Sequence, residues 1–199
     1  MRLPRSRETG FTLIELMVTL SVLAIILMLA SPSFADFFER YRLRSAVDDT
    51  LSVFAQARQA AVEADRNVTL AVGGSTTAWC VGAVQAAEPA ANSGALVDET
   101  PTACNCSTTP ASCQVDGGQM TVDGSGRPGV SVAAVGTAFT YDSKGGTLRE
   151  EDITAGLPKT ISFLSSSQRY GLAIQVNALG QARACTIAGK RPIPGYKPC

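Results

Sequence analysis

The chain contains no histidine, which removes the commonest general base and the commonest zinc ligand. No motif supplies a nucleophile and a base together, and no glycine-rich turn has the strand and helix context of a phosphate-cradling loop. The acidic run Glu150-Glu151-Asp152 is interpreted as an exposed charge run. We therefore expect a protein that is not an enzyme and that uses no cofactor and no metal.

Ionisable side chains are also scarce in a long apolar run near the N-terminus. Between Phe11 and Ala30 the only ionisable side chain is Glu15. About twenty such residues suffice to cross a bilayer as a helix. The segment before the run carries three arginines against one glutamate, so the positive-inside rule places the N-terminus in the cytoplasm and the rest of the chain across the membrane.

Glu15 is an unusual residue for a membrane helix, because a carboxylate there costs roughly 2.5 to 3.5 kcal/mol at the bilayer centre. It needs a cation, and no basic residue follows it within two helical turns. Cleavage between Gly10 and Phe11 would create a positively charged amine four residues before Glu15. That amine, on a neighbouring copy, would be a suitable partner.

The stretch Gly10-Phe11-Thr12-Leu13-Ile14-Glu15 resembles the processing site of type IV prepilins and type II secretion pseudopilins. The resemblance implies that a prepilin peptidase cuts after Gly10 and methylates the new N-terminus at Phe11. It also implies that Glu15 and Pro32, which both stand at matching positions, serve filament assembly. The alternatives are an ordinary secretory signal, for which the cleavage site after the run is poor, and a plain single-pass anchor, which would not need Glu15.

Three segments follow from this interpretation. Residues 1–10 form the leader peptide, residues 11–35 the transmembrane or filament-core helix, and residues 36–199 an extracytoplasmic domain of ordinary size. Within that domain we expect a helix at 36–65 and a β-rich part at 66–199, because glycine and proline are absent until the pattern changes to short β-prone runs.

The helix at 36–65 carries one apolar stripe with three- and four-residue spacing, which predicts packing against a sheet. The stripe consists of Leu43, Ala46, Val47, Leu51, Phe54, Ala57 and Ala61. One helix followed by antiparallel strands is an α+β fold, here pilin-like and stabilised by disulfides. The expected strands are Val68–Val72, Ala78–Val84, Gln119–Val122, Phe139–Tyr141, Thr160–Ser165, Tyr170–Asn177 and Gln181–Ile187, with a hairpin turn at 177–180.

Six cysteines in an extracytoplasmic chain indicate disulfides. Zinc is the rival for the cluster at 104–113, but that cluster lacks a second pair with zinc-site spacing. The preferred pairing is Cys185 with Cys199, Cys80 with Cys104, and Cys106 with Cys113. The choice between the adjacent Cys104 and Cys106 stays open.

The globular part resembles the GspH/FimT branch of minor pilins and pseudopilins, particularly its FimT and FimU members. Trp79-Cys80-Val81-Gly82 and Cys104-Asn105-Cys106 carry this likeness, although the branch's Gly-Arg in the last hairpin is Gly180-Gln181 here. The resemblance implies a minor pilin that primes assembly or caps the pilus tip, with a GspH-type secretion pseudopilin as an alternative. The implied partners are other major and minor pilins, the prepilin peptidase and the inner-membrane assembly machinery. The implied location is the inner membrane, as a single-pass protein with a periplasmic domain, and then the pilus at the cell surface.

The charge order supports a second alternative. After Asp152 there is no acidic residue but six lysines and arginines, so this part of the chain could form a basic face. The resemblance to FimT-type pilins implies capture of double-stranded DNA in natural transformation. The candidate contacts are Arg183, Lys190, Arg191 and Lys197. The competing interpretation is a solvated face, or surface pairs with the run at 150–152 that are worth at most about 1 kcal/mol each.

Overall fold

The computed structural model describes residues 11–87, 100–108, 112–133 and 136–199. The predicted leader, including Gly10, and most of the predicted loop at 86–101 lie outside these residues. The chain divides into two compact units, Met1–Phe38 and Glu39–Cys199. Everything that follows about sheets, core and disulfides concerns the second unit.

Helix α1 runs from Leu13 to Glu63, so the helix predicted at 36–65 is present. It ends in a Schellman-type cap, in which Asp65 takes a left-handed conformation with φ 49° and the Arg66 amide donates to the Ala61 carbonyl at 3.2 Å. The predicted apolar stripe is the buried face of the helix. Of its seven residues, six are buried and Leu51 is half-buried.

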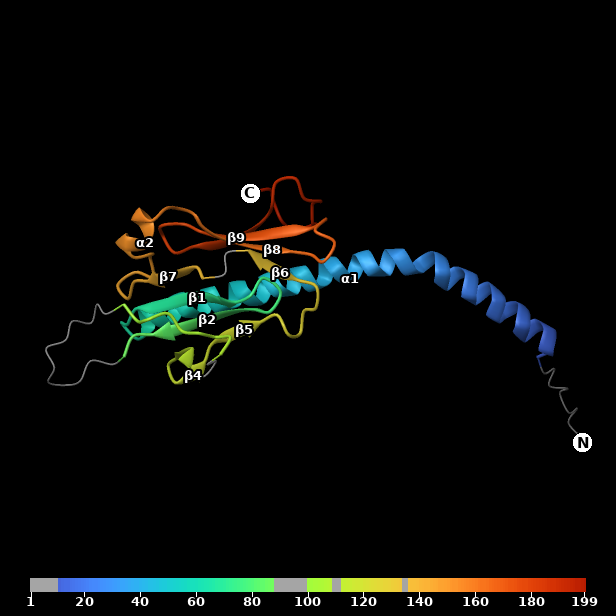
Figure 1. The fold of residues 1–199 in the computed structure, drawn as a ribbon, viewed down its shortest axis with the longest axis horizontal. Coiled ribbons are helices and arrows are strands. Elements are labelled where there is room, and N and C mark those ends of the chain that lie inside the picture. Colours follow the sequence, from blue (N-terminus) through green and yellow to red (C-terminus); the bar gives the residue numbers. More distant parts are fainter. Residues whose placement is uncertain (1–10, 88–99, 109–111, 134–135) are drawn as a thin grey trace, which may run out of the picture. The chain divides into compact units, whose positions relative to one another are not determined.

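The first sheet forms against this face (Figure 1). Its strand order is β5-β2-β1-β7, and every neighbouring pair is antiparallel. A buried hydroxyl pair, Thr69 and Thr140 at 2.8 Å, joins β1 to β7. The strands are β1 Val68–Gly74, β2 Trp79–Gln85, β5 Thr121–Asp123 and β7 Ala138–Tyr141.

The second sheet has the order β10-β9-β8-β6 and is also antiparallel. The predicted turn at 177–180 joins β9 to β10, and Gly180 closes it with φ +73°. A Cβ at Gly180 would lie 2.0 Å from the Gly146 carbonyl oxygen, so no other residue fits there. The strands are β6 Ser131–Ala133, β8 Lys159–Leu164, β9 Gly171–Val176 and β10 Ala182–Thr186.

Four features differ from the sequence prediction. The antiparallel sheet is divided in two, and the strand expected at Gln119–Val122 is split between β4 (Gly118–Gln119), which pairs with β3 (Gln114–Val115), and β5. Strand β6 was not predicted. The acidic run forms a short helix α2, Glu150–Thr154, in which Asp152 is half-buried and accepts a hydrogen bond from the Thr140 amide at 2.7 Å.

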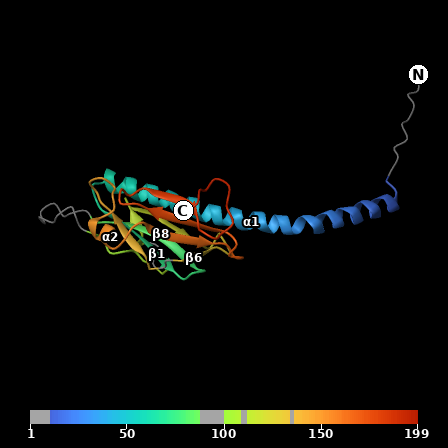
Figure 2. The ribbon, with the colours of Figure 1, turned by 90° about the horizontal axis from the view of Figure 1, so that it is seen from above.

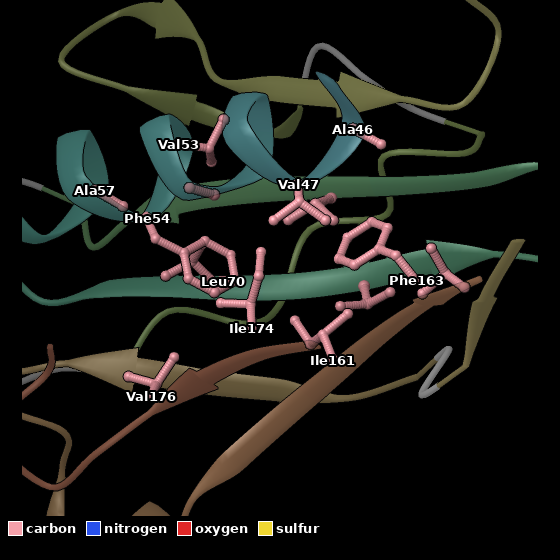
Figure 3. Close-up of a cluster of buried hydrophobic side chains, with 14 of the residues drawn as sticks. Ala46, Val47, Val53, Phe54, Ala57, Leu70, Ile161, Phe163, Ile174 and Val176 are labelled. Atoms are coloured by element: carbon pink, nitrogen blue, oxygen red, sulfur yellow. The ribbon is translucent and has the colours of Figure 1, made fainter. Parts of the chain in front are cut away.

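The core lies between α1 and the two sheets. Phe54 and Val47 of α1 point toward Leu70 of the first sheet and Ile161 and Ile174 of the second (Figure 3). Phe54 meets Phe139 edge to face at 5.5 Å, and Trp79 meets Phe163 in the same geometry at 5.4 Å. Such aromatic pairs add to the free energy gained from burial alone.

Candidate functional site

The N-terminal motif forms the first turn of α1. Thr12 is the N-cap: its hydroxyl oxygen accepts a hydrogen bond from the Glu15 amide at 3.3 Å, and its carbonyl accepts one from the Leu16 amide at 3.2 Å. Thr12 and Glu15 have the spacing of a capping box, and a carboxylate in the first turn also complements the helix dipole. The Glu15 carboxylate thus stands in the first turn, where negative charge favours the helix, a contribution that the sequence analysis missed although the Thr-x-x-Glu spacing signals it.

The side chains around the motif are exposed. Phe11 is 84% exposed, and the large apolar side chains from there to Leu29 are all between 50% and 84% exposed. Gly10 lies outside the described residues, and at Pro32 only the backbone is described, which continues the helix. By length and composition, no single helix of the described residues qualifies as a membrane span. Two parts of α1, Leu13–Leu29 and Ser33–Glu63, qualify when they are taken together as a bent pair.

Two disulfides lie against β2, one at Cys80 and the other beside Gly82. Cys80 pairs with Cys106 and Cys104 pairs with Cys113, so the predicted pairs of Cys80 with Cys104 and Cys106 with Cys113 are wrong. Cys106 is bonded to Cys80, and the Cys104 Sγ lies beside Gly82, two residues further along β2. A Cβ at Gly82 would lie 2.6 Å from the Cys113 Sγ and 3.0 Å from the Cys104 Sγ, so glycine makes room for this bridge.

The third disulfide, Cys185 with Cys199, is present as predicted. No group of three or more metal-ligating side chains occurs among the described residues, and all six cysteines are in disulfides.

The C-terminal loop closed by this disulfide is held against α1. The Tyr196 hydroxyl donates to the Asp48 carboxylate at 2.7 Å, and Arg44 donates to the Pro194 carbonyl while its guanidinium lies 5.6 Å from the centre of the Tyr196 ring. Burial first, and then the bond to the negatively charged Asp48, raises the pKa of Tyr196 to about 12. Ile193 is buried in the core. The loop is therefore a fixed part of the domain.

The four candidate DNA contacts do not converge on one point. Lys190 and Arg191 lie beside the β8–β9 turn, where the Lys190 Nζ donates to the Gln168 carbonyl at 2.8 Å and the Arg191 amide donates to the Arg169 carbonyl at 2.9 Å. Arg183 lies on the outer face of the second sheet, and Lys197 lies in the C-terminal loop, where its carbonyl accepts a hydrogen bond from the Thr186 amide. Arg183, Arg191 and Lys197 are exposed, and Lys190 is half-buried.

Part of the expected local charge pairing is present. The Lys159 ammonium lies 3.5 Å from the Asp152 carboxylate, with both side chains largely buried. The remaining basic residues of the last part of the chain have no ion pair with the 150–152 run among the described residues.

A polar groove of about 520 Å³ surrounds Arg183. Its amide orientations are fixed, because Arg183 donates to the Gln175 oxygen at 3.1 Å, and the Asn177 oxygen accepts from the Gln181 backbone amide at 3.0 Å. The Asn177 nitrogen in turn donates to the Gln181 oxygen at 3.2 Å. Each amide oxygen already accepts a hydrogen bond, whereas the Gln175 and Gln181 side-chain nitrogens donate to no described residue. The groove therefore offers mainly donors and one positive charge.

Comparisons with known proteins agree with the N-terminal geometry. The family model for the prokaryotic N-terminal methylation motif matches residues 5–31, which include Thr12 and Glu15. Among solved structures, the chain is similar to the crystal structure of the type IV minor pilin FimU of Pseudomonas aeruginosa strain PAO1, at 18% identity over 74% of this chain and 90% of that chain, with a TM-score of 0.45. The comparison with curated proteins finds no match.

The matched motif covers the start of α1, and the rest of the chain folds as one long helix packed on antiparallel sheets with three disulfides. The chain thus combines a prokaryotic N-terminal methylation motif with an α+β architecture in which that motif begins the long helix.

Proposed function

We propose that the chain is a minor pilin that is cut after Gly10 by a prepilin peptidase, methylated on Phe11, and inserted through α1 into a type IV pilus, where it primes assembly or caps the tip. The observation that carries this proposal is the methylation motif at the start of a helix whose large side chains up to Leu29 are apolar and exposed. Such a surface needs a lipid or protein environment.

In the filament, Glu15 would meet the Phe11 amine of a neighbouring subunit. An uncompensated carboxylate in an apolar environment costs several kcal/mol, so this pair would favour one axial register of the helices. Helix capping is a competing explanation for Glu15. A glutamine at this position keeps the capping box and removes the charge, so it separates the two explanations.

The experiment expresses the full chain in a cell with a type IV pilus and measures two products: the N-terminus of the mature chain by mass spectrometry, and the amount of chain in sheared filaments. We expect a methylated Phe11 and filament incorporation in the unaltered protein. Glu15→Gln keeps the capping box but removes the charge, so it should leave processing intact and reduce incorporation at least about tenfold, as expected for several kcal/mol of lost pairing.

Thr12→Ala is the matched control, since it removes the cap and keeps the charge. It should cost about 1 kcal/mol of helix stability and reduce incorporation much less than Glu15→Gln. Equal incorporation of Glu15→Gln and the unaltered chain would assign Glu15 to capping alone. An uncut leader would remove the proposal altogether.

Double-stranded DNA binding in natural transformation is a second candidate function. The donor-rich groove around Arg183 favours it, because amide donors beside a guanidinium suit a phosphate oxygen. Lys190, Arg191 and Lys197 add positive charge within the C-terminal loop.

The test is a titration of a labelled duplex with the full chain in detergent at several salt concentrations. Each phosphate contact contributes a slope of about −0.9 to the plot of log affinity against log salt. Lys190→Ala with Arg191→Ala should therefore flatten the slope by about 2, and Arg183→Ala by about 1. Lys144→Ala, an exposed lysine in the turn after β7, is the matched control and should leave the slope unchanged. An identical slope in all four proteins would exclude these residues as contacts.

A further inference from the structure

A second groove, of about 370 Å³, lies between the C-terminal part of α1 and the beginning of β10. Figure 2 shows the C-terminal strands, in red, beside this part of the helix. Its walls include Leu51, Phe54, Ala55 and Arg58 of α1, with Tyr141 and Ala182 opposite. The groove is mostly apolar, and nothing in the proposed function uses it.

The chain's own C-terminal loop already fills the neighbouring stretch of the space between α1 and β10. Tyr196 reaches Asp48, one helical turn before Leu51. The loop also pairs with the edge of β10: the Thr186 amide donates to the Lys197 carbonyl at 2.8 Å, and the Thr186 carbonyl accepts from the Cys199 amide at 3.1 Å. This stretch shows what the space accepts, namely an extended segment with a large side chain directed at α1.

The edge of β10 stays open where the loop ends. Thr186 uses its backbone groups on the side away from β9, whereas the Ile187 amide donates to the Gly171 carbonyl on the β9 side. The register with β9 is continuous, so the backbone amides and carbonyls of successive β10 residues point alternately toward β9 and away from it. The amide and carbonyl of Ala182, like those of Thr186, therefore point away from β9. The Ala182 amide and carbonyl have no partner among the described residues, which leaves an edge that can pair with another strand.

Two polar groups at the groove are also unsatisfied. The Tyr141 hydroxyl is buried and has no hydrogen-bond partner. Arg58 uses its Nε to donate to the Gly146 carbonyl at 2.8 Å, and no described residue engages its two terminal nitrogens. None of the groove residues is acidic. A carboxylate is the group that would complement this charge.

Exposed apolar side chains flank the same place. Val62, which lies next to Gly146 and Arg58, is 48% exposed, and Leu179, beside Gly180, is 60% exposed. Together with the groove they give an apolar surface that includes the Arg58 guanidinium, whose terminal nitrogens have no partner among the described residues.

We propose that this groove docks an extended segment of a partner subunit, which pairs with Ala182 at the edge of β10, covers Leu51 and Phe54 with an apolar side chain, and brings a carboxylate to Arg58. The inference goes beyond the proposed function and rests on it only for the statement that the partner is a filament subunit. The binding chemistry itself follows from the open edge, the apolar walls and the unpaired guanidinium.

The experiment uses the full chain in detergent and two short blocked peptides, one with alternating valine and glutamate and one with glutamine in place of glutamate. Binding is measured by fluorescence polarisation of the labelled peptides. We expect the glutamate peptide to bind about tenfold more tightly than the glutamine peptide, because a charge-assisted hydrogen bond replaces a neutral one. Arg58→Gln should bring the two affinities together.

Ala55→Trp fills the groove from an exposed position of α1 and should abolish binding. Gln56→Trp, at the next exposed position but outside the groove, is the matched control and should bind normally. Hydrogen exchange of the Ala182 amide in the unaltered protein gives a readout that needs no variant, and we expect peptide binding to slow it.

The proposal is overturned if the glutamate peptide does not bind, if both peptides bind equally, if a folded Ala55→Trp protein still binds, or if saturating peptide leaves Ala182 exchange unchanged. None of these outcomes bears on leader processing or filament incorporation. Failure of this inference is therefore distinguishable from failure of the proposed function.

Discussion

Tyr196 makes the stability of the domain sensitive to alkaline pH. Its pKa is raised from the ordinary 10.0 to about 12 in the folded protein, so the folded state holds the proton more strongly than the unfolded state. The stabilisation is complete below pH 10 and is lost as the pH rises from 10.0 to about 12. We expect Tyr196→Phe to lose less stability than the unaltered protein over this interval.

Urea unfolding at pH 8 and at steps up to pH 11 checks this expectation, with the difference between the two proteins as the quantity of interest. Burial also raises the pKa of Tyr141, but that residue is present in both proteins and its effect cancels. Parallel loss of stability in both proteins would contradict the assignment to Tyr196.

Phe54 of α1 packs in the core that the helix forms with both sheets. It is 1% exposed and meets Phe139 edge to face. Phe54→Ala should lower the free energy of unfolding by about 3–5 kcal/mol, because it leaves a cavity in a packed core. Gln56→Ala, on the exposed side of the same helix, should change it by less than about 0.5 kcal/mol. Denaturant unfolding of the two variants measures the contrast, and similar values would place the core elsewhere.

At the scale of elements, the C-terminal loop depends on its disulfide. The Cys185 to Cys199 separation is 14 residues, for which the loss of the cross-link costs about 3 kcal/mol. We therefore expect the double variant Cys185→Ala with Cys199→Ser to unfold at lower denaturant concentration by that amount. A loss close to zero would show that Tyr196, Arg44 and Ile193 hold the loop without the disulfide.

The elements that the sequence predicted correctly are those with a long period or a clear boundary. The stripe from Leu43 to Ala61 repeats over several turns, and α1 buries it as expected. Strands β3 and β4 have two residues each and α2 has five, so none is long enough to show a period. Such elements are stabilised by contacts with the surrounding chain, and these contacts cannot be predicted from the local sequence.

The same reasoning explains what was missed at the candidate sites. Arg44 and Asp48 contact the C-terminal loop across sequence separations of 150 and 148 residues, and no local pattern announces such a contact. Which of the adjacent Cys104 and Cys106 bonds to Cys80 depends on how their segment lies along β2, and no local pattern in the sequence shows this. By contrast, Glu15 could be chosen as a candidate from the sequence, because an ionisable group in an apolar run is visible there.

At the scale of the whole molecule, the second unit contains the buried core and the three disulfides. The buried hydrophobic residues of the described chain begin at Leu43, and all three disulfides lie in Glu39–Cys199. We expect a fragment that starts at Glu39 to unfold in one cooperative transition, as small single domains usually do. Circular dichroism and peptide mapping without reductant check the cooperativity and the three cystines. A gradual transition, or a Cys80 to Cys104 peptide, would contradict this view.

The glycine under the Cys104 to Cys113 bridge links three positions that are far apart in the sequence. A side chain at position 82 and a cystine above it exclude one another, because the Cβ would come within 2.6 Å of sulfur. Related chains that have lost this cystine are released from the requirement for glycine, and chains that keep it are not. We therefore expect positions 82, 104 and 113 to vary together in evolution. An alignment of homologous sequences would then indicate the bridge even where no structure is known.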